Sequence, residues 1–288
     1  MKFLYGQNII NALRCPICAS SMHLQENGNA KCASLLCNGE RRHCYDIASS
    51  GYVNLMPPGR TAGGDSKSAV RARRDFLSLG YYEDAALALC DAMSAHSSHE
   101  GLLIDAGCGE GYYSSMLASR GFSVAGVDLS RDAAEASAKR AAKQNITNAF
   151  FSVASVFELP FADGSADAVV NVFAPCAEGE FLRVLRPNGI VAVVYAGPTH
   201  LMGLKKALYS ETRENDGRSD MPTHMELIEE RRVTFDITVE GQQNLQALFA
   251  MTPYYWRTSP KDSEKLKSLE KLETPVDMII AIYRKTDK

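Results

Sequence analysis

The segment IDAGCGEGYY at residues 104–113 constrains the fold of this chain most strongly. An apolar run ends there in Asp105, and glycines follow at positions 107, 109 and 111. Glycine permits a tight turn with the backbone close to a ligand, and the helix expected beyond the turn offers free N–H groups. A dinucleotide-binding fingerprint would have glycine where Tyr112 stands. The pattern therefore favours a cofactor that has no pyrophosphate.

Strands and helices are expected to alternate along the chain. Helical patterns at 68–96 predict two helices broken at Gly80, and further helices are expected at 112–120, at 131–145 and in a segment that ends at 187–189. Apolar runs predict strands at 101–107, 122–130, 149–155, 167–174 and 189–197. This alternation predicts an α/β, Rossmann-like fold with a mostly parallel central sheet.

Asp128 closes the second predicted strand, 17 residues after Gly111. A carboxylate at this place can accept hydrogen bonds from both hydroxyls of an adenosine ribose. The alternative for Asp128 is a helix N-cap, a role that Ser130 fits better. We therefore expect Asp128 to bind a ribose.

Five of the eight cysteines lie between positions 15 and 44, a crowding that favours a metal over disulfides. Cys15 and Cys18 have the spacing of a zinc knuckle, whereas a redox CxxC would need a thioredoxin-like context that is missing here. Two more ligands are needed, and the candidates are Cys32, Cys37, His43 and Cys44. Thiolates with one imidazole and no spare position predict a closed, structural zinc site.

The chain divides into a predicted zinc-binding module at 1–53, a linker at 54–70 and a catalytic domain at 71–288. The linker contains PPGRTAGGDSK, which is rich in proline and glycine. Residues 1–74 carry a net charge of +6 and the rest of the chain −9. A basic amino-terminal part suits a phosphate-bearing partner, although a solvated surface is the alternative.

No run of about 18 or more apolar residues occurs, so no membrane span is expected. The apolar stretch near the start is broken at 6–8 and is followed by no small-residue cleavage site, so no signal peptide is expected either. These features predict a cytoplasmic protein.

The order of motifs resembles that of class I S-adenosylmethionine-dependent methyltransferases. The motifs are IDAGCGEGYY, GVDLS, ELPFADGSADAVV and FLRVLRPNGIV. The resemblance implies S-adenosylmethionine as cofactor, with its ribose on Asp128 and its adenine beside Ser155. Its methionine part would be held by Asp105 and by the loop residues Gly107, Gly109, Glu110 and Gly111.

Almost the whole chain is similar to the 23S ribosomal RNA guanine-N1 methyltransferases. The similar segments include HCYDIASSGYVNLMP, RARRDFLSLGYY, FAPCAEGEFLRVLRP, GPTHLMGLK and MTPYYWRTSP. The resemblance implies that Cys15, Cys18 and His43 bind zinc. Cys37 is the preferred fourth ligand, ahead of Cys32 and then Cys44. The resemblance also implies 23S ribosomal RNA as partner and a homodimer with a shared RNA cleft.

The resemblance also implies that Tyr82 and His200 contact the cofactor, although His200 could instead be a helix-start histidine satisfied by its neighbours. Asn171 and Phe173 are expected near the target base, and Phe173 would equally suit a core position. No residue is identifiable as the general base that must accept the N1 proton of guanine.

A basic cluster and an aromatic cluster are further candidates for RNA contact. Arg71, Arg73 and Arg74 could form a phosphate clamp, or simply a solvated helix face. The aromatic run 254–256 could stack on a base or pack internally. Two other functions stay open at this point, a small-molecule methyltransferase and a non-catalytic zinc-containing RNA-binding protein.

Overall fold

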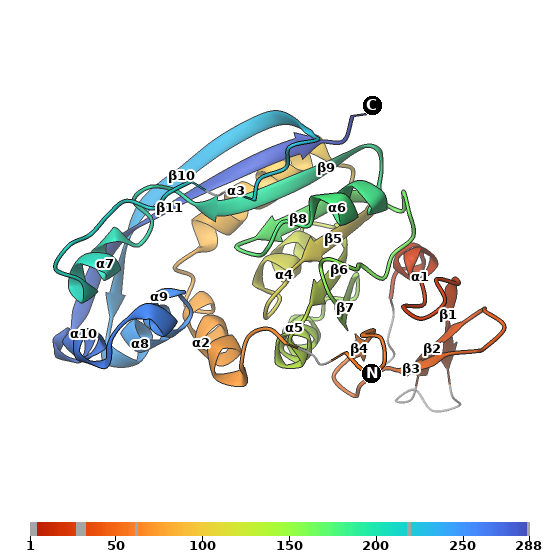
Figure 1. Cartoon of the computed structure of the whole chain (residues 1–288), viewed down its shortest axis with the longest axis horizontal. Coiled ribbons are helices and arrows are strands. Elements are labelled where there is room, and N and C mark those ends of the chain that lie inside the picture. The colour runs from red at the N-terminus through yellow and green to blue at the C-terminus, as the bar shows by residue number, and fades with distance from the viewer. Residues whose placement is uncertain (1–4, 27–32, 61–62, 218–219, 287–288) are drawn as a thin grey trace.

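The computed structural model describes residues 5–26, 33–60, 63–217 and 220–286. Two sheets organise it (Figure 1). A small antiparallel sheet has the strand order β1-β2-β3, and a sheet of eight strands has the order β10-β11-β9-β8-β5-β6-β7-β4. The small sheet lies at the β4–β7 side of the large one (Figure 1).

The centre of the large sheet is parallel, which confirms the predicted fold class. Its strands β5 and β7 are buried at every position, as parallel strands covered on both faces require. The central strands are β5 (Leu102–Ala106), β6 (Ser123–Asp128), β7 (Ala149–Val153), β8 (Ala166–Val172) and β9 (Leu185–Ala196).

Two long strands extend the sheet beyond β9, and the sequence had not predicted them. Strands β10 (Glu226–Glu240) and β11 (Lys271–Arg284) are antiparallel to each other, and β11 is antiparallel to β9. The register sets Thr234 of β10 opposite Asp277 of β11. The turn that carries His200 follows β9 and is hydrogen-bonded to β11.

The predicted break at Gly80 is confirmed, because one helix ends at Leu77 and the next begins at Glu83. The helix predicted to end at 187–189 instead ends at Val184, because Leu185 is extended and pairs with Ala166 in the sheet. The helices are α2 (Lys67–Leu77), α3 (Glu83–His96), α4 (Tyr112–Ser119), α5 (Arg131–Lys143), α6 (Glu178–Val184), α7 (Met202–Leu208), α8 (Gln242–Ala250), α9 (Tyr254–Arg257) and α10 (Pro260–Glu264). Across the described ranges, no helix has the length and apolar character that a membrane crossing needs.

The first 60 residues contribute to both sheets. The ribbon strands are β1 (Met22–Glu26), β2 (Ala33–Cys37) and β3 (Cys44–Asp46), preceded by helix α1 (Gln7–Ala12). Strand β4 (Tyr52–Asn54) instead pairs in parallel with β7 of the large sheet. Leu13, just after α1, is fully buried in the same apolar core as Phe150 and Phe161. The predicted division at residue 53 is therefore not a break in packing.

The predicted linker at 54–70 is also partly ordered against the large sheet. Helix α2 begins inside it at Lys67, with Ser66 as its N-cap. The hydroxyl of Ser130 donates a hydrogen bond of 2.7 Å to the carbonyl oxygen of Asp65. This segment thus lies over the start of α5, close to Asp128.

Candidate functional site

The glycine loop between β5 and α4 has the backbone that only glycine adopts readily. The φ angles of Gly107, Gly109 and Gly111 are 89°, 55° and 79°. A side chain at Gly107 would also place its Cβ 2.3 Å from the Cβ of Ala174. The loop is therefore held tightly at the carboxyl edge of the sheet, with the amino end of α4 directly behind it.

Asp105 lies beneath this loop with only 1% of its surface exposed. Burial raises the pKa of its carboxyl to about 7, and the 2.5 Å hydrogen bond donated by Ser114 Oγ works in the opposite direction. The nearby carboxylates of Asp128 and Glu110 raise the pKa further. A cationic ligand would favour ionised Asp105, as the ammonium or sulfonium group of S-adenosylmethionine would do.

Asp128 ends β6 and has its carboxylate oriented by two backbone amides. Gly109 N donates to one carboxylate oxygen at 2.9 Å and Ser130 N to the other at 2.8 Å. Each carboxylate oxygen has a second lone pair, so both can still accept a ribose hydroxyl. The cap of α5 is Ser130, whose hydroxyl accepts from Ala133 N, so the N-cap alternative for Asp128 is excluded.

Ser155 lies two residues beyond the end of β7, the strand that pairs with β6 at Asp128. Ala154 N donates a 3.0 Å hydrogen bond to the carbonyl of Asp128, and Ser155 Oγ accepts from Phe157 N. The side chain of Phe157 is exposed. A polar and an apolar side chain thus follow β7 at this edge of the sheet, and the contact of Ser155 with an adenine stays a prediction.

Glu110 differs from the other predicted cofactor residues. Its buried carboxylate forms an ion pair with Arg140 of α5, at 2.6 and 2.9 Å. The structure therefore directs this side chain toward α5, where it ties the glycine loop to the helix. A contact of Glu110 with the cofactor would thus involve its backbone in the loop, and it stays a prediction.

Tyr82, Phe173 and His200 come together although they are far apart in the sequence. Tyr82 Oη lies 3.4 Å from His200 Nε2, and the Phe173 and His200 rings stack with centroids 5.6 Å apart. Burial lowers the pKa of His200 to about 4, so its ring is neutral at pH 7. His200 is therefore satisfied by its neighbours, as the alternative expected, and its contact with the cofactor stays a prediction.

Asn171 and Phe173 have different positions on the loop that follows β8. Asn171 is fully buried, and its amide nitrogen donates to the carbonyls of Ala106 and Pro175, each at 3.0 Å. It therefore supports the loop rather than facing a substrate. Phe173 is 47% exposed and has a φ of 51°, so it is not a core residue and is available to a base.

The three arginines of α2 do not form one clamp. Arg71 and Arg74 are exposed and pair with Asp75, at 3.5 and 2.8 Å. Arg73 instead pairs with Asp65 at 2.5 Å and reaches the glycine loop at Gly109. Arg73 thus lies beside the glycine loop, a position that the sequence did not distinguish from those of Arg71 and Arg74.

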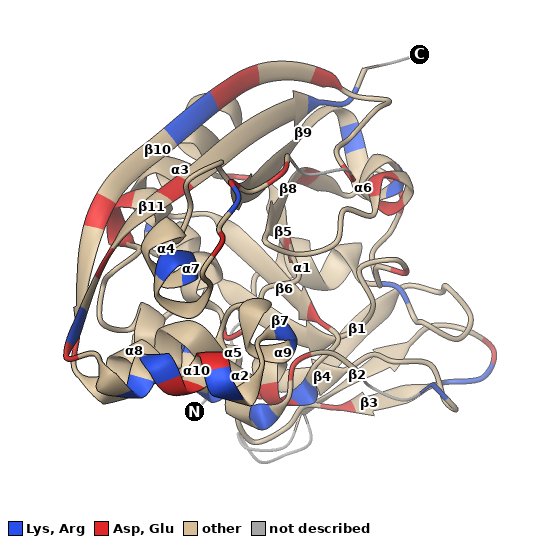
Figure 2. Cartoon of the chain, turned by 60° about the vertical axis from the view of Figure 1, so that its left-hand side comes forward, with Lys and Arg blue, Asp and Glu red and all other residues tan. Residues whose placement is uncertain are grey.

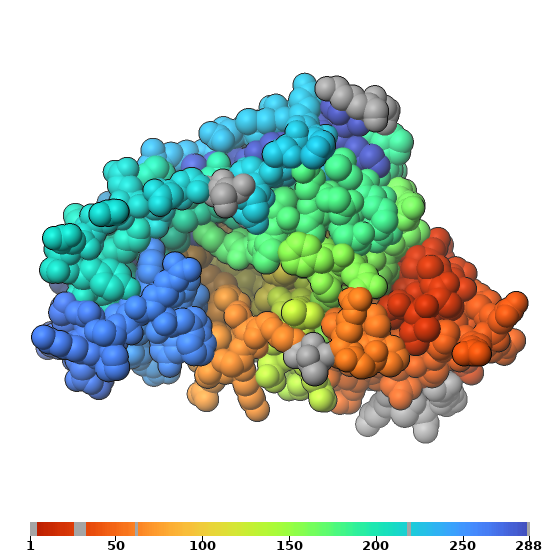
Figure 3. Space-filling model, viewed as in Figure 1, coloured from red at the N-terminus to blue at the C-terminus, as the bar shows by residue number. Residues whose placement is uncertain are grey.

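Helix α9 carries a cluster of aromatic residues. Trp256 is 72% exposed, and Tyr255 contacts its ring edge-on. Tyr254 is packed and donates a hydrogen bond to Asn215, which in turn donates to the carbonyl of His200. Figure 3 shows a hollow bordered by α2 (orange) below, by the α8–α9 region (blue) at the left and by the green part of the chain above.

The four predicted zinc ligands converge at one point of the ribbon. The ligand atoms of Cys15, Cys18, Cys37 and His43 all lie within 4.8 Å of one another. His43 presents Nδ1, at 3.4–3.5 Å from the three sulfurs, and the sulfurs of Cys18 and Cys37 are 3.8 Å apart. A tetrahedral zinc ion with ordinary bond lengths separates its ligand atoms by about 3.5–3.8 Å, so the cluster fits zinc.

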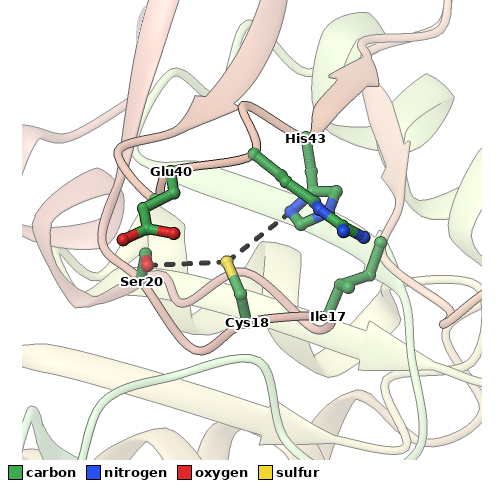
Figure 4. Close-up of a pocket in the computed structure, with 7 residues that line it drawn as sticks. Ile17, Cys18, Ser20, Glu40 and His43 are labelled. Atoms are coloured by element: carbon green, nitrogen blue, oxygen red, sulfur yellow. Dashed lines mark hydrogen bonds between the residues drawn. The ribbon is translucent and has the colours of Figure 1, made fainter.

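The surroundings of the cluster support a structural site. The Tyr45 hydroxyl lies 3.2 Å from Cys15 Sγ, and a hydrogen bond with Ser20 lowers the pKa of Cys18 to about 6. Figure 4 shows Cys18 between Ser20 and His43 in a pocket that Ile17 and Glu40 also line. Cys44 is exposed outside the cluster, and Cys32 lies outside the described residues.

Asp277 and Arg232 were not identified from the sequence. Asp277 is fully buried in β11, pairs with Arg232 of β10, and its backbone N–H donates to His200 Nδ1. The signal available was a lone aspartate inside the apolar run of β11, since a buried charge requires a partner.

Comparison with known proteins matches both parts of the chain. A zinc-ribbon model described as "RlmA, N-terminal" matches residues 13–60, and a model described as a methyltransferase domain matches residues 98–252. A solved structure from Anaeromyxobacter dehalogenans, "Putative Type II Methyltransferase", shares the fold with a TM-score of 0.50. It is 19% identical and covers 70% of this chain and 97% of that one.

Two relatives are similar over most of their length. The "Putative 23S rRNA (guanine-N(1)-)-methyltransferase YxjB" of Bacillus subtilis (strain 168) is 32% identical over 94% of this chain and 96% of that protein. The "23S rRNA (guanine(748)-N(1))-methyltransferase" of Streptomyces fradiae is 28% identical, with coverages of 89% and 90%. The chain thus belongs to the 23S rRNA (guanine-N1)-methyltransferase family, S-adenosylmethionine-dependent enzymes with a zinc ribbon before the methyltransferase domain.

Proposed function

We propose that this protein transfers a methyl group from S-adenosylmethionine to N1 of a guanine in 23S ribosomal RNA. The observation that carries the proposal is similarity over 94% of the chain to a relative with this name. The zinc ribbon and the glycine loop, which this similarity includes together, are parts of one packed structure here through β4 and α1. A small-molecule methyltransferase has no evident need for the ribbon.

The glycine loop and its two aspartates are assigned to the cofactor. When bound, S-adenosylmethionine supplies an electrophilic methyl group on a positive sulfonium. Asp128 would accept hydrogen bonds from its ribose hydroxyls, and Asp105 would favour a positive charge near the glycine loop. Tyr82 and His200 would complete the wall at the methionine end.

Phe173 is assigned to the target guanine. Its half-exposed ring can stack on a splayed base, and a fixed base plane orients N1 for in-line transfer. His200, directly behind this ring, has its Nδ1 occupied by the Asp277 N–H and is neutral at pH 7. We therefore assign His200 to positioning and not to removal of the N1 proton.

Exposed arginines on both parts of the molecule are assigned to RNA phosphates. Arg41 and Arg42 lie on the ribbon, and Arg71 and Arg74 lie on α2. Figure 2 shows α2 among the elements that carry basic residues along one edge of the molecule. Such contacts position RNA without reading its sequence. A cytoplasmic location and the pairing of two subunits belong to the same proposal, and sedimentation of the purified chain tests the pairing.

The test uses the full-length, zinc-loaded chain with protein-free 23S ribosomal RNA. Methylation at N1 blocks base pairing, so the product appears as a stop in primer extension at one guanine. Asp128→Ala should weaken the stop when S-adenosylmethionine is limiting, because it lowers the affinity for the cofactor. Arg41→Gln combined with Arg42→Gln should weaken RNA binding while leaving cofactor affinity unchanged.

The matched control is Arg120→Gln, which removes an exposed arginine paired with Asp91 and should leave both properties intact. A wild-type protein that binds S-adenosylmethionine but methylates no guanine N1 in 23S ribosomal RNA would contradict the proposed substrate. Methylation of a small molecule under the same conditions would then favour the other enzyme class.

A further inference from the structure

The carboxylate of Asp277 is the most completely bonded charged group around His200. It is fully buried and accepts two hydrogen bonds from Arg232, at 2.7 and 2.8 Å. It also accepts two from Thr199, from the backbone N–H at 2.9 Å and the hydroxyl at 2.7 Å, and one from the Thr234 hydroxyl at 3.2 Å. A buried carboxylate with this many donors has one geometry available to it.

The backbone of Asp277 is attached to the same turn as its side chain. Its N–H donates to His200 Nδ1 at 3.2 Å, and its carbonyl accepts from Gly197 N at 2.8 Å. The neighbouring Pro275 carbonyl accepts from Leu201 N at 2.8 Å. The turn at 197–201 is therefore fixed to β11 at several consecutive points.

These bonds determine which nitrogen of His200 carries the proton. A backbone N–H can only donate, so Nδ1 of the neutral ring is the acceptor and Nε2 carries the hydrogen. Nε2 faces Tyr82 Oη at 3.4 Å. The Tyr82 oxygen thus receives this hydrogen bond, and its own O–H is left to donate to a different acceptor.

We propose that Asp277, held by Arg232, is a positioning residue that keeps His200 in the Nε2–H form and thereby makes Tyr82 a hydrogen-bond donor to the cofactor. The acceptor would be the carboxylate of the methionine part. Phe173 stacks on His200, so Asp277 and Arg232 also fix the position of the Phe173 ring, which is assigned to the target guanine. The inference rests on the proposed function in one respect, that Tyr82 and His200 face S-adenosylmethionine.

The first measurement is made on the cofactor-free, zinc-loaded chain. The ¹⁵N chemical shifts of a histidine ring distinguish a protonated Nε2 from a protonated Nδ1. Wild-type His200 should show the Nε2–H form alone. Asp277→Asn, which keeps the size and removes the charge, should give a mixture of the two forms, and Thr199→Val should give a smaller shift of the same kind. Thr199→Val removes only one hydroxyl and serves if the aspartate variant does not fold.

The second measurement is a double-mutant cycle on cofactor affinity. Tyr82→Phe should weaken S-adenosylmethionine binding roughly tenfold, as expected for loss of a hydrogen bond to a charged group, and Asp277→Asn should weaken it by a smaller factor, because part of the population keeps the Nε2–H form. Their combination should weaken it no more than Tyr82→Phe alone, because both act through one O–H. Independent, multiplying losses, or an unchanged His200 form in Asp277→Asn and Thr199→Val, would overturn the proposal.

The matched control is Glu180→Gln. Glu180 also pairs with an arginine, Arg183, and accepts a backbone N–H, from Leu159 at 2.7 Å, but lies far from His200 in the fold. It should lower stability without changing the His200 spectrum or cofactor affinity. Both readouts are obtained without RNA, so a failure of the proposed substrate leaves them unchanged, and a failure of this inference leaves wild-type methylation of 23S ribosomal RNA unchanged.

Discussion

The zinc ribbon and the large sheet are stabilised in different ways. In the ribbon, two of the buried residues, Cys15 and Cys37, are themselves zinc ligands, and few apolar side chains accompany them. In the large sheet, β5 and β7 are buried at every position. Folding of the ribbon should therefore depend on metal, whereas folding of the sheet depends on apolar burial.

The zinc ligands do not mark where stabilisation by metal ends and stabilisation by apolar burial begins. Residues 7–13 precede the first zinc ligand, and β4 follows the last, yet both pack into the large sheet. These two segments flank the ribbon, whose own buried residues Met22, Leu35 and Ile47 belong to the same apolar cluster. Four predictions test this comparison.

The largest effect is expected for Cys37→Ser. Structural zinc sites contribute about 10–16 kcal/mol of binding free energy in small peptides, so loss of one ligand should release the metal and unfold the ribbon. Metal analysis after dialysis should fall from about one zinc per chain to nearly none. Amide exchange should rise in β1–β3 but not in β5–β8. Cys44→Ser is the control and should keep its zinc; zinc retention by Cys37→Ser would exclude this ligand.

The next effect concerns Leu13, at the junction. Leu13→Ala should destabilise the large sheet by about 2–5 kcal/mol, because the side chain is fully buried against that core. Denaturant unfolding measures this loss, with the exposed Leu79→Ala as a control that should change little. If only the ribbon is destabilised, residues 7–13 belong with the ribbon. For the same reason, deletion of residues 1–53 should damage the sheet as well as RNA binding.

The third prediction concerns His200 and the pH dependence of the free energy of unfolding of the part of the protein built on the large sheet. Its pKa of about 4 in the folded protein lies below the ordinary value of 6.5, so the unfolded chain takes up the proton first as the pH falls. The wild-type free energy of unfolding should therefore decrease relative to His200→Gln between about pH 6.5 and pH 4, by up to roughly 3 kcal/mol, and the difference should be constant above about pH 7. Zinc loss at low pH affects both proteins and cancels. A pH-independent difference would contradict the buried, neutral state.

The smallest effect is expected for Asp128→Ala. Loss of hydrogen bonds to the ribose should weaken S-adenosylmethionine binding by about 1.5–3 kcal/mol, with zinc content unchanged. Calorimetric titration measures this, and Asp132→Ala at the start of α5 is the matched control. Equal affinities of the Asp128 variant and wild type would remove Asp128 from the cofactor site.

Features encoded over short stretches were predictable from the sequence. The glycine loop, the position of Asp128 at the end of its strand and the Cys15–Cys18 knuckle each depend on neighbours in the chain, and the structure places them as expected. Side-chain direction was less predictable: Glu110 and Asn171 lie in the right loops but face α5 and the backbone. Which way they point depends on packing against segments 30 and 65 residues away.

Long-range pairing could not be predicted. β4 pairs with β7 and buries Tyr52 and Val53 there, although no local motif in the sequence indicates this partner. Asp277 lies 45 residues from Arg232 and 78 from Thr199, so only the register of β10, β11 and the turn after β9 brings them together.

The pairing of β4 with β7 has a consequence for synthesis of the protein on the ribosome. Asn54 pairs with Val153, which is translated about a hundred codons later, or roughly 5–20 s at ordinary elongation rates. During this interval the nascent chain already contains all four zinc ligands but not the strand that β4 needs. The ribbon can acquire its metal during this interval, whereas β4 has to wait until β7 has been translated.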